Sequence, residues 1–353
     1  MRVGVLSNIF KSFSDYKEVE QDLVQVGIAV KEALESHNHE VSFFDVNEKT
    51  FEKLRKAKID IAFNVCERFN GNSFFEPHVA AMLELLGLPY TGSGPLALAT
   101  CINKIRVKEI LMFYKIPTPK YQVFYSRNKK LDADLEFPLI VKPSQTDNSI
   151  GITQDSVVNA ESELRKKVDY VIRTYNQPAL VEEYIEGRDL DVGILGNGNS
   201  MVNLPITEIA YKGNSKSPYN IFSYEAKWDK DSDLFKNTVY SSVTDLPKYI
   251  DLRIKKIAAD IYNILECRDY GRVDIRLSKE NIPYVLEINP NPGISADCSI
   301  PHAAESLGIS YKDMIYKIFC HALERYNMKP RPIISPFQPA PQNKELINMQ
   351  IST

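Results

Sequence analysis

Apolar positions in the first ninety residues follow two alternating spacings. The run V-G-V-L-S at residues 3–7 is typical of a buried strand, and apolar residues at three- and four-residue spacing follow it from Val19 to Leu34. Two further strand-like runs, E-V-S-F-F-D-V and I-D-I-A-F-N-V, enclose a short charged helix, and another helical stripe runs from Val79 to Leu86. This alternation of strands and helices predicts an α/β layer with a parallel sheet.

Turn-forming residues divide the rest of the chain. Glycine and proline cluster at 92–95, and two strand-like runs flank a charged helix at 161–175 before longer strands begin at Gly187. After Tyr326 five prolines prevent a continued helix, which predicts an extended or mobile tail. The predicted segments are residues 1–94, 95–186, 187–329 and a proline-rich tail at 330–353.

The composition limits the class of protein. The chain has 353 residues, which is longer than a single compact core usually supports, so two or three subdomains are expected. Its formal net charge is -3, so it does not show the excess of basic residues that is typical of proteins that bind nucleic acids or membrane surfaces. Its five cysteines are scattered without a C-x-x-C pair, which argues against a disulfide framework or structural zinc. No run reaches the length of a membrane span or forms a signal peptide. We expect a cytoplasmic protein with small-molecule ligands and no nucleic-acid or membrane partner.

Two strand-like runs late in the chain carry polar residues at alternate positions. Arg272 and Asp274 share one face of G-R-V-D-I-R-L, and Glu287 and Asn289 share one face of Y-V-L-E-I-N. The short polar link between the runs predicts an antiparallel pair. If the polar faces coincide, two carboxylates and an amide supply the oxygen ligands that Mg²⁺ prefers. The alternative to a metal site is a solvated sheet face with cross-strand ion pairs. The rigid turn N-P-N-P-G that follows favours the ligand-binding interpretation, because its backbone N–H groups can face a ligand.

Two other segments could contact a nucleotide. Lys142 ends the run F-P-L-I-V-K-P-S before a polar turn that leads to Gly151, an arrangement that suits a phosphate but also occurs at ordinary strand ends. The chain has no G-x-x-x-x-G-K-[ST] motif, and no G-x-G-x-x-G follows the first strand. Glu182, Glu183 and Asp189 could accept hydrogen bonds from an adenine amino group or ribose hydroxyls, although acids near a turn are more commonly solvated.

In their order and spacing, these segments resemble the D-alanine-D-alanine ligase family of ATP-grasp enzymes. The resemblance covers about residues 1–326 and is strongest in L-E-L-L-G-L-P-Y-T-G-S-G, I-V-K-P-S, Y-E-A-K, G-R-V-D and L-E-I-N-P-N-P-G. It implies an α/β, three-subdomain ATP-grasp fold. The N-terminal parallel-sheet (Rossmann-like) domain would lie on the substrate side, followed by a central and a C-terminal catalytic ATP-grasp subdomain with ATP between their antiparallel sheets. It also implies a homodimer.

The resemblance assigns nucleotide contacts residue by residue. Lys104 and Lys142 look like the phosphate contacts, and Glu182 and Asp189 look like the adenine-side and ribose acceptors. Lys227, in Y-E-A-K-W, is similar to the lysine of a mobile loop that closes over the triphosphate. The implied ATP-binding residues are Lys104, Lys142, Ser149, Glu182, Glu183, Tyr184, Ile185, Asp189 and Leu286.

The family's reaction implies roles for the two late strands. A carboxylate oxygen attacks the γ-phosphorus of ATP to give an acyl phosphate and ADP, and an amine then attacks the activated carbonyl. Asp274, Glu287 and Asn289 match the ligands of two Mg²⁺ ions, for which Mn²⁺ is a possible substitute. Arg272 and the backbone of Gly293 match the groups that hold the oxyanion.

The amino-acid end of the implied site departs from the family pattern. Family members carry H-G-x-x-G-E-D-G after the third strand, whereas this chain has N-V-C-E-R-F-N-G-N-S-F-F-E-P-H, which puts Glu67 near the family histidine. The family's early glutamate, which meets the first substrate's ammonium, has no secure match among Glu18, Glu20 and Gln21.

Further departures affect the groups around the acceptor. The family's hydrogen-bonded serine and tyrosine fall at Asn148 and Trp228, so that triad cannot form. The serine that binds the second substrate's carboxylate falls at Cys298 or Ser299, and the sequence leaves the choice open. The candidate substrate contacts are Glu67, Arg68, Asn148, Trp228, Arg276, Cys298 and Ser299.

These features predict an enzyme of the ATP-grasp carbon-nitrogen ligase class. We expect an ATP-dependent, ADP-forming carboxylate-amine ligase that forms an amide or peptide bond between amino-acid-like substrates other than two D-alanines. One alternative is a genuine D-alanine-D-alanine ligase of cell-wall synthesis, and another is a non-catalytic ATP-binding regulatory protein. The retained Arg272 and Lys227 argue against the second alternative, because binding alone needs no oxyanion donor.

Overall fold

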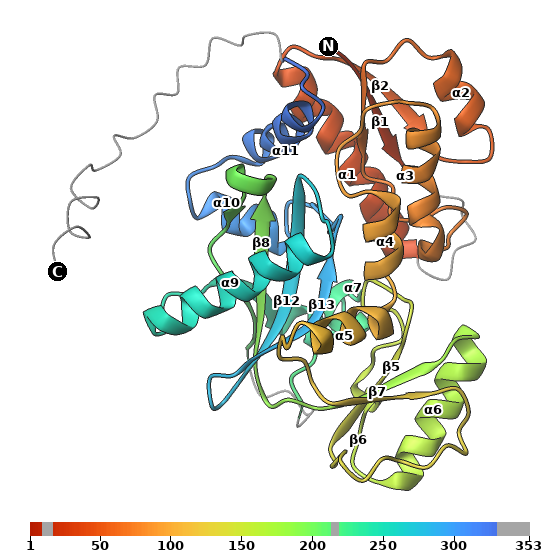
Figure 1. The fold of residues 1–353 in the computed structure, drawn as a ribbon, viewed down its shortest axis with the longest axis vertical. Helices are drawn as coiled ribbons and strands as arrows, with labels where there is room; N and C mark the ends of the chain where they lie inside the picture. The colour runs from red at the N-terminus through yellow and green to blue at the C-terminus, as the bar shows by residue number, and fades with distance from the viewer. Residues whose placement is uncertain (9–16, 213–218, 330–353) are drawn as a thin grey trace, which may run out of the picture.

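The computed structural model describes residues 1–8, 17–212 and 219–329, so the predicted tail at 330–353 lies outside the described residues. Three sheets and the helices packed on them make up this part of the chain (Figure 1). The strands of each sheet fall within one of the segments 1–94, 95–186 and 187–329, and we keep those boundaries as a proposal.

The N-terminal sheet is parallel, as predicted, with the strand order β2-β1-β3. Its central strand is buried from Val3 to Ser7, as expected when both faces are covered. The apolar stripe from Val19 to Leu34 is buried, and it packs partly against the late helix α11. The elements of this layer are β1 (Arg2–Ser7), α1 (Lys17–Ser36), β2 (Glu40–Asp45), α2 (Thr50–Lys56), β3 (Ile61–Asn64), α3 (Glu76–Leu85), α4 (Pro95–Cys101) and α11 (Tyr311–Arg325).

The central sheet is antiparallel, with the order β4-β7-β5-β6, and α6 packs on it (Figure 1). The predicted charged helix at 161–175 is confirmed, because α6 buries Leu164, Val168 and Val171 against the sheet and leaves its charged face outward. The strands and helix are β4 (Tyr121–Phe124), β5 (Leu139–Pro143), β6 (Val157–Val158), α6 (Glu161–Tyr175) and β7 (Ala179–Glu183).

The C-terminal sheet has the order β11-β10-β8-β12-β13, and β9 also pairs with β8. The segment 226–242 contains the end of α7, the short helix α8 and the edge strand β11, whose mostly half-buried residues give no strong apolar pattern. The elements are β8 (Gly187–Leu195), β9 (Val202–Asn203), β10 (Thr207–Tyr211), α7 (Tyr224–Trp228), α8 (Asp233–Asn237), β11 (Thr238–Ser242), α9 (Lys248–Ile264), β12 (Tyr270–Ser278), β13 (Pro283–Asn289) and α10 (Ser299–Glu305).

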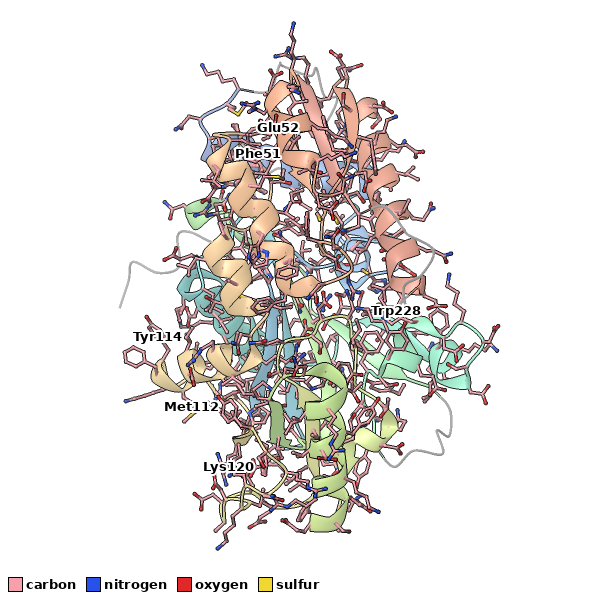
Figure 2. All side chains as sticks on the ribbon, turned by 90° about the vertical axis from the view of Figure 1, so that its right-hand side faces the viewer. Phe51, Glu52, Met112, Tyr114, Lys120 and Trp228 are labelled. Carbon is pink, nitrogen blue, oxygen red and sulfur yellow. The ribbon has the colours of Figure 1, made fainter. Side chains whose placement is uncertain are left out.

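Helix α5 (Lys104–Phe113) has its carboxyl-terminal end at the surface and its amino-terminal end toward the interior of the molecule. Its outer end carries the exposed side chains of Met112 and Tyr114, and Tyr114 points away from the body of the molecule in Figure 2. Its first turn begins after Asn103, whose side chain accepts a hydrogen bond from the Arg106 backbone and so satisfies a free N–H group. This helix therefore presents its amino-terminal residues to the interior, where the candidate site lies.

Candidate active site

A cavity lies where the N-terminal layer meets the two antiparallel sheets, and it collects residues that are far apart in the sequence. Of the predicted site residues, only Arg68 and Ser299 do not line it. Those that do are Glu67, Lys104, Lys142, Asn148, Ser149, Glu182, Glu183, Tyr184, Ile185, Asp189, Lys227, Trp228, Arg272, Asp274, Arg276, Leu286, Glu287, Asn289, Gly293 and Cys298.

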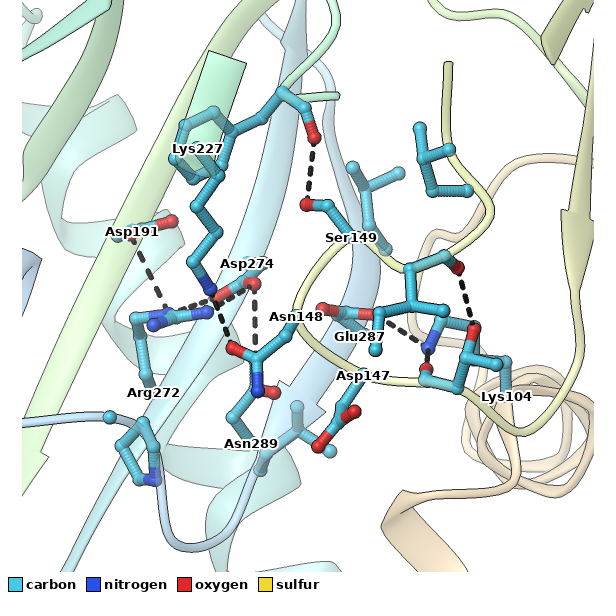
Figure 3. Close-up of a pocket in the computed structure, with 18 of the residues that line it drawn as sticks. Lys104, Asp147, Asn148, Ser149, Asp191, Lys227, Arg272, Asp274, Glu287 and Asn289 are labelled. Carbon is cyan, nitrogen blue, oxygen red and sulfur yellow. Dashed lines mark hydrogen bonds and ion pairs between the residues drawn. The ribbon is translucent and has the colours of Figure 1, made fainter. Parts of the chain in front are cut away.

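One wall of the cavity is the antiparallel pair β12 and β13, which confirms the predicted pairing of these strands. Asp274 faces Glu287 across the ladder, and Arg272 faces Asn289. The Arg272 guanidinium lies 2.6 Å and 2.9 Å from the two oxygens of Asp274, and the Asn289 amide donates to Asp274 Oδ2 at 3.1 Å (Figure 3). The polar faces predicted from alternation therefore coincide.

A third strand adds an acid, Asp191, that was not among the predicted site residues. Asp191 pairs in register with Asp274 from β8, and its Oδ2 lies 3.5 Å from Arg272 Nε. The signal was present in G-R-D-L-D-V, where Asp189 and Asp191 alternate, but nothing in the sequence showed that β8 would pair with β12.

The two carboxylates of this wall have opposite electrostatic environments. Burial, with the Asp191 charge, raises the pKa of Asp274 to about 7 despite the adjoining Arg272 guanidinium. Burial would also raise the pKa of Glu287, but the Lys104 ammonium, 3.1 Å from Glu287 Oε2, more than offsets it and lowers the pKa to about 2. Glu287 is therefore held ionised at neutral pH.

The donor set on this wall fits a hard divalent cation. No group of three or more His, Cys, Asp or Glu side chains that could hold a metal is found in the described part of the chain. The predicted set instead combines the carboxylates of Asp274 and Glu287 with the amide of Asn289, all facing one cavity. Oxygen donors of this kind suit Mg²⁺, which keeps water and substrate oxygens in its remaining positions.

A charged cluster lies behind the nucleotide-side residues. Lys108, one turn after Lys104 on α5, is fully buried with its ammonium 2.7 Å from Glu182 Oε1, and Lys142 lies 2.6 Å from Glu182 Oε2. Burial lowers the pKa of Lys108 and would raise that of Glu182, but the two ammonium groups together lower the pKa of Glu182. Lys108 was not assigned a role from the sequence, because its spacing from Lys104 is also that of an ordinary helix face.

Arg276 lies with the predicted nucleotide-binding residues. Its guanidinium contacts Asp189 Oδ2 at 2.5 Å, the Ile185 carbonyl at 2.8 Å and the Tyr184 hydroxyl at 2.9 Å. Asp189 also accepts a hydrogen bond from Tyr211 at 2.6 Å. These contacts occupy Arg276, which was a candidate substrate contact. They place it beside the residues that the resemblance assigns to the adenine and the ribose.

At the amino-acid end, Asn148 links three parts of the chain. Its side-chain amide donates to Glu67 Oε2 at 3.1 Å. Its side-chain oxygen accepts a hydrogen bond from Lys227 Nζ at 2.8 Å (Figure 3). Its backbone carbonyl accepts from the Trp228 indole at 3.0 Å. The neighbouring Ser149 hydroxyl donates to the Phe222 carbonyl at 2.8 Å. At the two positions where the resemblance places the family's serine and tyrosine, Asn148 and Trp228 thus form a different hydrogen-bonded group.

Two of the remaining predicted substrate residues, Glu67 and Cys298, lie beside Gly293. A side-chain carbon at Gly293 would lie 3.6 Å from Glu67 Oε1 and 3.8 Å from the Cys298 sulfur, so all three border the same space. Cys298 lines the cavity, whereas Ser299 is buried outside it. Arg68 is also buried, and its ion pair with Asp147, at 3.3 Å, connects it to a residue that lines the cavity.

Helix α1 contributes an acid to this end of the cavity, although not one of those considered from the sequence. Glu18 and Gln21 are exposed, and the side chain of Glu20 is not among those described. Asp22 lines the cavity three residues after Val19, on the same helix face, and accepts a hydrogen bond from Ser295 at 2.5 Å. The apolar stripe of α1 was the signal that could have identified this face.

Comparisons with known proteins address the family. A model described as "D-ala D-ala ligase C-terminus" matches residues 110–320. A D-alanine-D-alanine ligase of Bordetella pertussis is 33% identical over 298 residues, which cover 84% of this chain and 89% of that protein. The chain belongs to the D-alanine-D-alanine ligase family. A second member, from Carboxydothermus hydrogenoformans, is 33% identical over 337 residues, 92% of this chain and 99% of its own length.

Solved structures agree with membership of the D-alanine-D-alanine ligase family. The D-alanine-D-alanine ligase from Bacillus anthracis complexed with ATP has a TM-score of 0.72 and 26% identity, covering 93% of this chain and 99% of the other. The predicted three-subdomain ATP-grasp fold and the predicted class, an ATP-grasp carbon-nitrogen ligase, are confirmed. In the described part of this family member, no helix is long and apolar enough to cross a membrane.

The family relatives also bear on the two substrates. The Bordetella pertussis and Carboxydothermus hydrogenoformans relatives are named D-alanine-D-alanine ligases, and they do not support our expectation that this chain uses other substrates. The alternative, a D-alanine-D-alanine ligase, agrees better with these relatives. One relative, protein y4sG of Sinorhizobium fredii, is described as uncharacterised and is 35% identical over 270 residues.

Proposed function

We propose that this protein is an ATP-dependent, ADP-forming ligase that joins two D-alanines through an acyl phosphate. The observation that carries the proposal is the wall formed by β12 and β13, where Arg272 and two carboxylates face one cavity in a chain of this family. A protein that only bound a nucleotide would not need a guanidinium placed beside the reacting carbonyl.

The nucleotide would lie between the central and C-terminal sheets. The Bacillus anthracis ligase was solved in complex with ATP, which supports ATP binding by this chain. Lys104 and Lys142 both line the cavity and would neutralise phosphate oxygens as charge shifts toward ADP. Glu182 is committed to Lys108 and Lys142, so we assign it the task of orienting Lys142 rather than of accepting the adenine amino group. The residues that remain for the base and ribose are Glu183, Tyr184, Ile185, Asp189 and Leu286.

The chemistry would take place beside Gly293. Asp274, Glu287 and Asn289 would hold Mg²⁺, which neutralises phosphate charge when it is bound. The carboxylate of the first amino acid attacks the γ-phosphorus, and Arg272 and the Gly293 N–H then stabilise the oxyanion that forms when the amine attacks the acyl phosphate. Lys227 reaches over the cavity from α7 to Asn148, so it would close the site and exclude the water that hydrolyses acyl phosphates.

The proposal is tested by incubating the protein with ATP, MgCl₂ and D-alanine. We expect ADP and the D-alanyl-D-alanine dipeptide in equal amounts, measured by a coupled ADP assay and by mass spectrometry of the product. Omitting the amino acid is the control, and it should leave only slow ATP hydrolysis. No dipeptide at saturating D-alanine would contradict the D-alanine assignment.

A second candidate is a ligase of the same mechanism with other amino-acid-like substrates. It is favoured by Glu67, Asn148 and Trp228, which give the amino-acid end a charge and shape unlike the family pattern. A pooled amino-acid reaction analysed by mass spectrometry would identify such a product. If no amino acid or small amine raises ADP release, the remaining alternative, a non-catalytic ATP-binding regulator, is supported instead.

We also keep two proposals about the state of the protein in the cell. The resemblance to the family implies a homodimer, and the scattered cysteines favour the cytoplasm. Light scattering on the purified chain tests the first proposal, and fractionation of the source cells tests the second.

A further inference from the structure

The loop that follows β3 fixes Glu67 at the edge of the cavity. The Asn8 side-chain oxygen accepts hydrogen bonds from the backbone N–H groups of Glu67 and Arg68, both at 3.2 Å. The Asn8 amide in turn donates to the Arg68 carbonyl. The end of β1 therefore holds this loop by three hydrogen bonds, and the Glu67 side chain starts from a defined position.

The two oxygens of the Glu67 carboxylate differ in their surroundings. Oε2 accepts a hydrogen bond from the Asn148 amide, whose own oxygen must face Lys227 because an ammonium can only donate. Oε1 has no hydrogen-bond or ion-pair partner among the residues that the structure describes, and it borders the space beside Gly293. One oxygen thus anchors the carboxylate, and the other faces the place where the oxyanion would form.

The other acids at this end of the cavity are engaged differently. Asp22 accepts from Ser295, Asp147 pairs with Arg68, and the Asn291 amide approaches Glu76 at 3.5 Å. The Trp228 indole cannot take a proton, because its nitrogen is only a donor. Among these groups, Glu67 alone combines an uncommitted oxygen with a position beside Gly293.

We propose that Glu67 is the general base that takes a proton from the acceptor amine, an inference that rests on the proposed function. The acceptor amino acid enters as an ammonium ion, and Glu67 Oε1 removes one of its protons. The freed nitrogen lone pair forms the C–N bond to the acyl carbon, and the C–O bond to phosphate breaks. The second surplus proton of the amine leaves with the phosphate, so the products are the amide, inorganic phosphate and a protonated Glu67.

The electrostatic environment suits this role. Burial, with the negative charge of Asp147, raises the pKa of Glu67 to about 7, while Asn148 and Lys227 act in the opposite direction. A base whose pKa lies near the working pH is the most effective, because it is ionised yet still binds a proton. The titratable groups that face Glu67 from the surrounding elements are Asp22, Glu76, Asp147, Lys227, Tyr270 and Cys298.

The test uses two nucleophiles on the full-length protein. Hydroxylamine is largely unprotonated at neutral pH and traps acyl phosphates as hydroxamates without help from a base, whereas an amino acid must first lose a proton. We expect Glu67→Gln to lower dipeptide formation by about a hundredfold or more, the range of a general-base effect. Hydroxamate formation with ATP and the same carboxylate should stay close to the wild-type rate.

Each outcome separates the possibilities. Equal losses of dipeptide and hydroxamate in Glu67→Gln would overturn the inference, because Glu67 would then act on the first step or on the fold. The matched control is Glu76→Gln, another buried cavity acid, which should leave the ratio of the two products unchanged. A selective loss of dipeptide in Glu76→Gln as well would also overturn it. Wild-type protein that forms no hydroxamate with any amino acid would instead refute the proposed function itself.

Discussion

The buried ammonium of Lys108 lies 2.7 Å from one oxygen of Glu182, whose other oxygen lies 2.6 Å from the cavity-lining Lys142. The Lys108 side chain is 0% exposed, so its ammonium lies in the protein interior, whereas the Lys142 ammonium lies at the cavity. The negative charge of the Glu182 carboxylate is compensated by both ammonium groups. The position of Lys142, which we propose as a phosphate contact, therefore depends on a residue that no substrate touches.

Lys108→Met should weaken both the fold and nucleotide binding. Removing one member of a buried ionic group leaves its partner uncompensated, so we expect the free energy of unfolding to fall by about 3 kcal/mol. Because Lys142 would be drawn toward Glu182, the KM for ATP should rise more than kcat falls. Urea denaturation and ATP titrations measure the two effects. Arg106→Met on the exposed side of α5 is the control, with a stability change within about 0.5 kcal/mol. An unchanged KM for ATP in the Lys108 variant would refute the orienting role.

Arg272→Ala should slow turnover while leaving ATP binding nearly intact. Loss of one oxyanion donor typically costs about a hundredfold or more in turnover. Arg272 lies against Asp274 and Asp191, so the Arg272→Lys variant, which keeps a positive charge there, separates charge balance from oxyanion binding. We expect this second variant to remain slow, because an ammonium does not reproduce the planar fork. Calorimetric titration with a non-hydrolysable ATP analogue tests the binding, and a large loss would move Arg272 to the nucleotide site.

Glu287→Gln should remove most activity through loss of the metal. The variant keeps the shape of the side chain but loses its negative charge. In the wild type, the neighbouring Lys104 ammonium keeps the Glu287 carboxylate ionised. We expect an increased Mg²⁺ requirement in a titration of activity against MgCl₂, with reduced turnover even at saturation. Unchanged turnover at saturating Mg²⁺ would show that Glu287 is not a ligand.

The rate of dipeptide formation should depend on pH through Glu67. Burial raises the pKa of this carboxyl to about 7, so the group loses its proton, and becomes able to act as a base, as the pH rises through that value. We therefore expect kcat/KM for the acceptor amino acid to fall below about pH 7 in the wild type. Glu67→Gln should lose this acidic limb and show a flatter profile. An identical acidic limb in both proteins would assign it to another group.

Parts of the site were predictable because they depend on local patterns. Strand alternation placed Asp274 and Glu287 on polar faces, and the short link between their strands predicted the pairing that the structure shows. Asp191 and Lys108 were missed because their roles depend on which strand pairs with β12 and on burial of a helix face, both properties of the tertiary fold. Arg276 shares a sheet face with Asp274, as the alternation of side chains predicts. Alternation along one strand does not show which residues of other strands lie beside it, so the contact between Arg276 and Asp189 could not be predicted.

Transfer of an oxygen atom from the substrate carboxylate to phosphate is the most direct test of activation through an acyl phosphate. The amino acid that the enzyme consumes, D-alanine on our proposal, is labelled with heavy oxygen in its carboxylate and turned over with ATP and MgCl₂. We expect one labelled oxygen in each phosphate released, because the attacking carboxylate oxygen becomes the bridging atom of the acyl phosphate and leaves with the phosphate. Unlabelled phosphate accompanying the ligated product would contradict activation through an acyl phosphate.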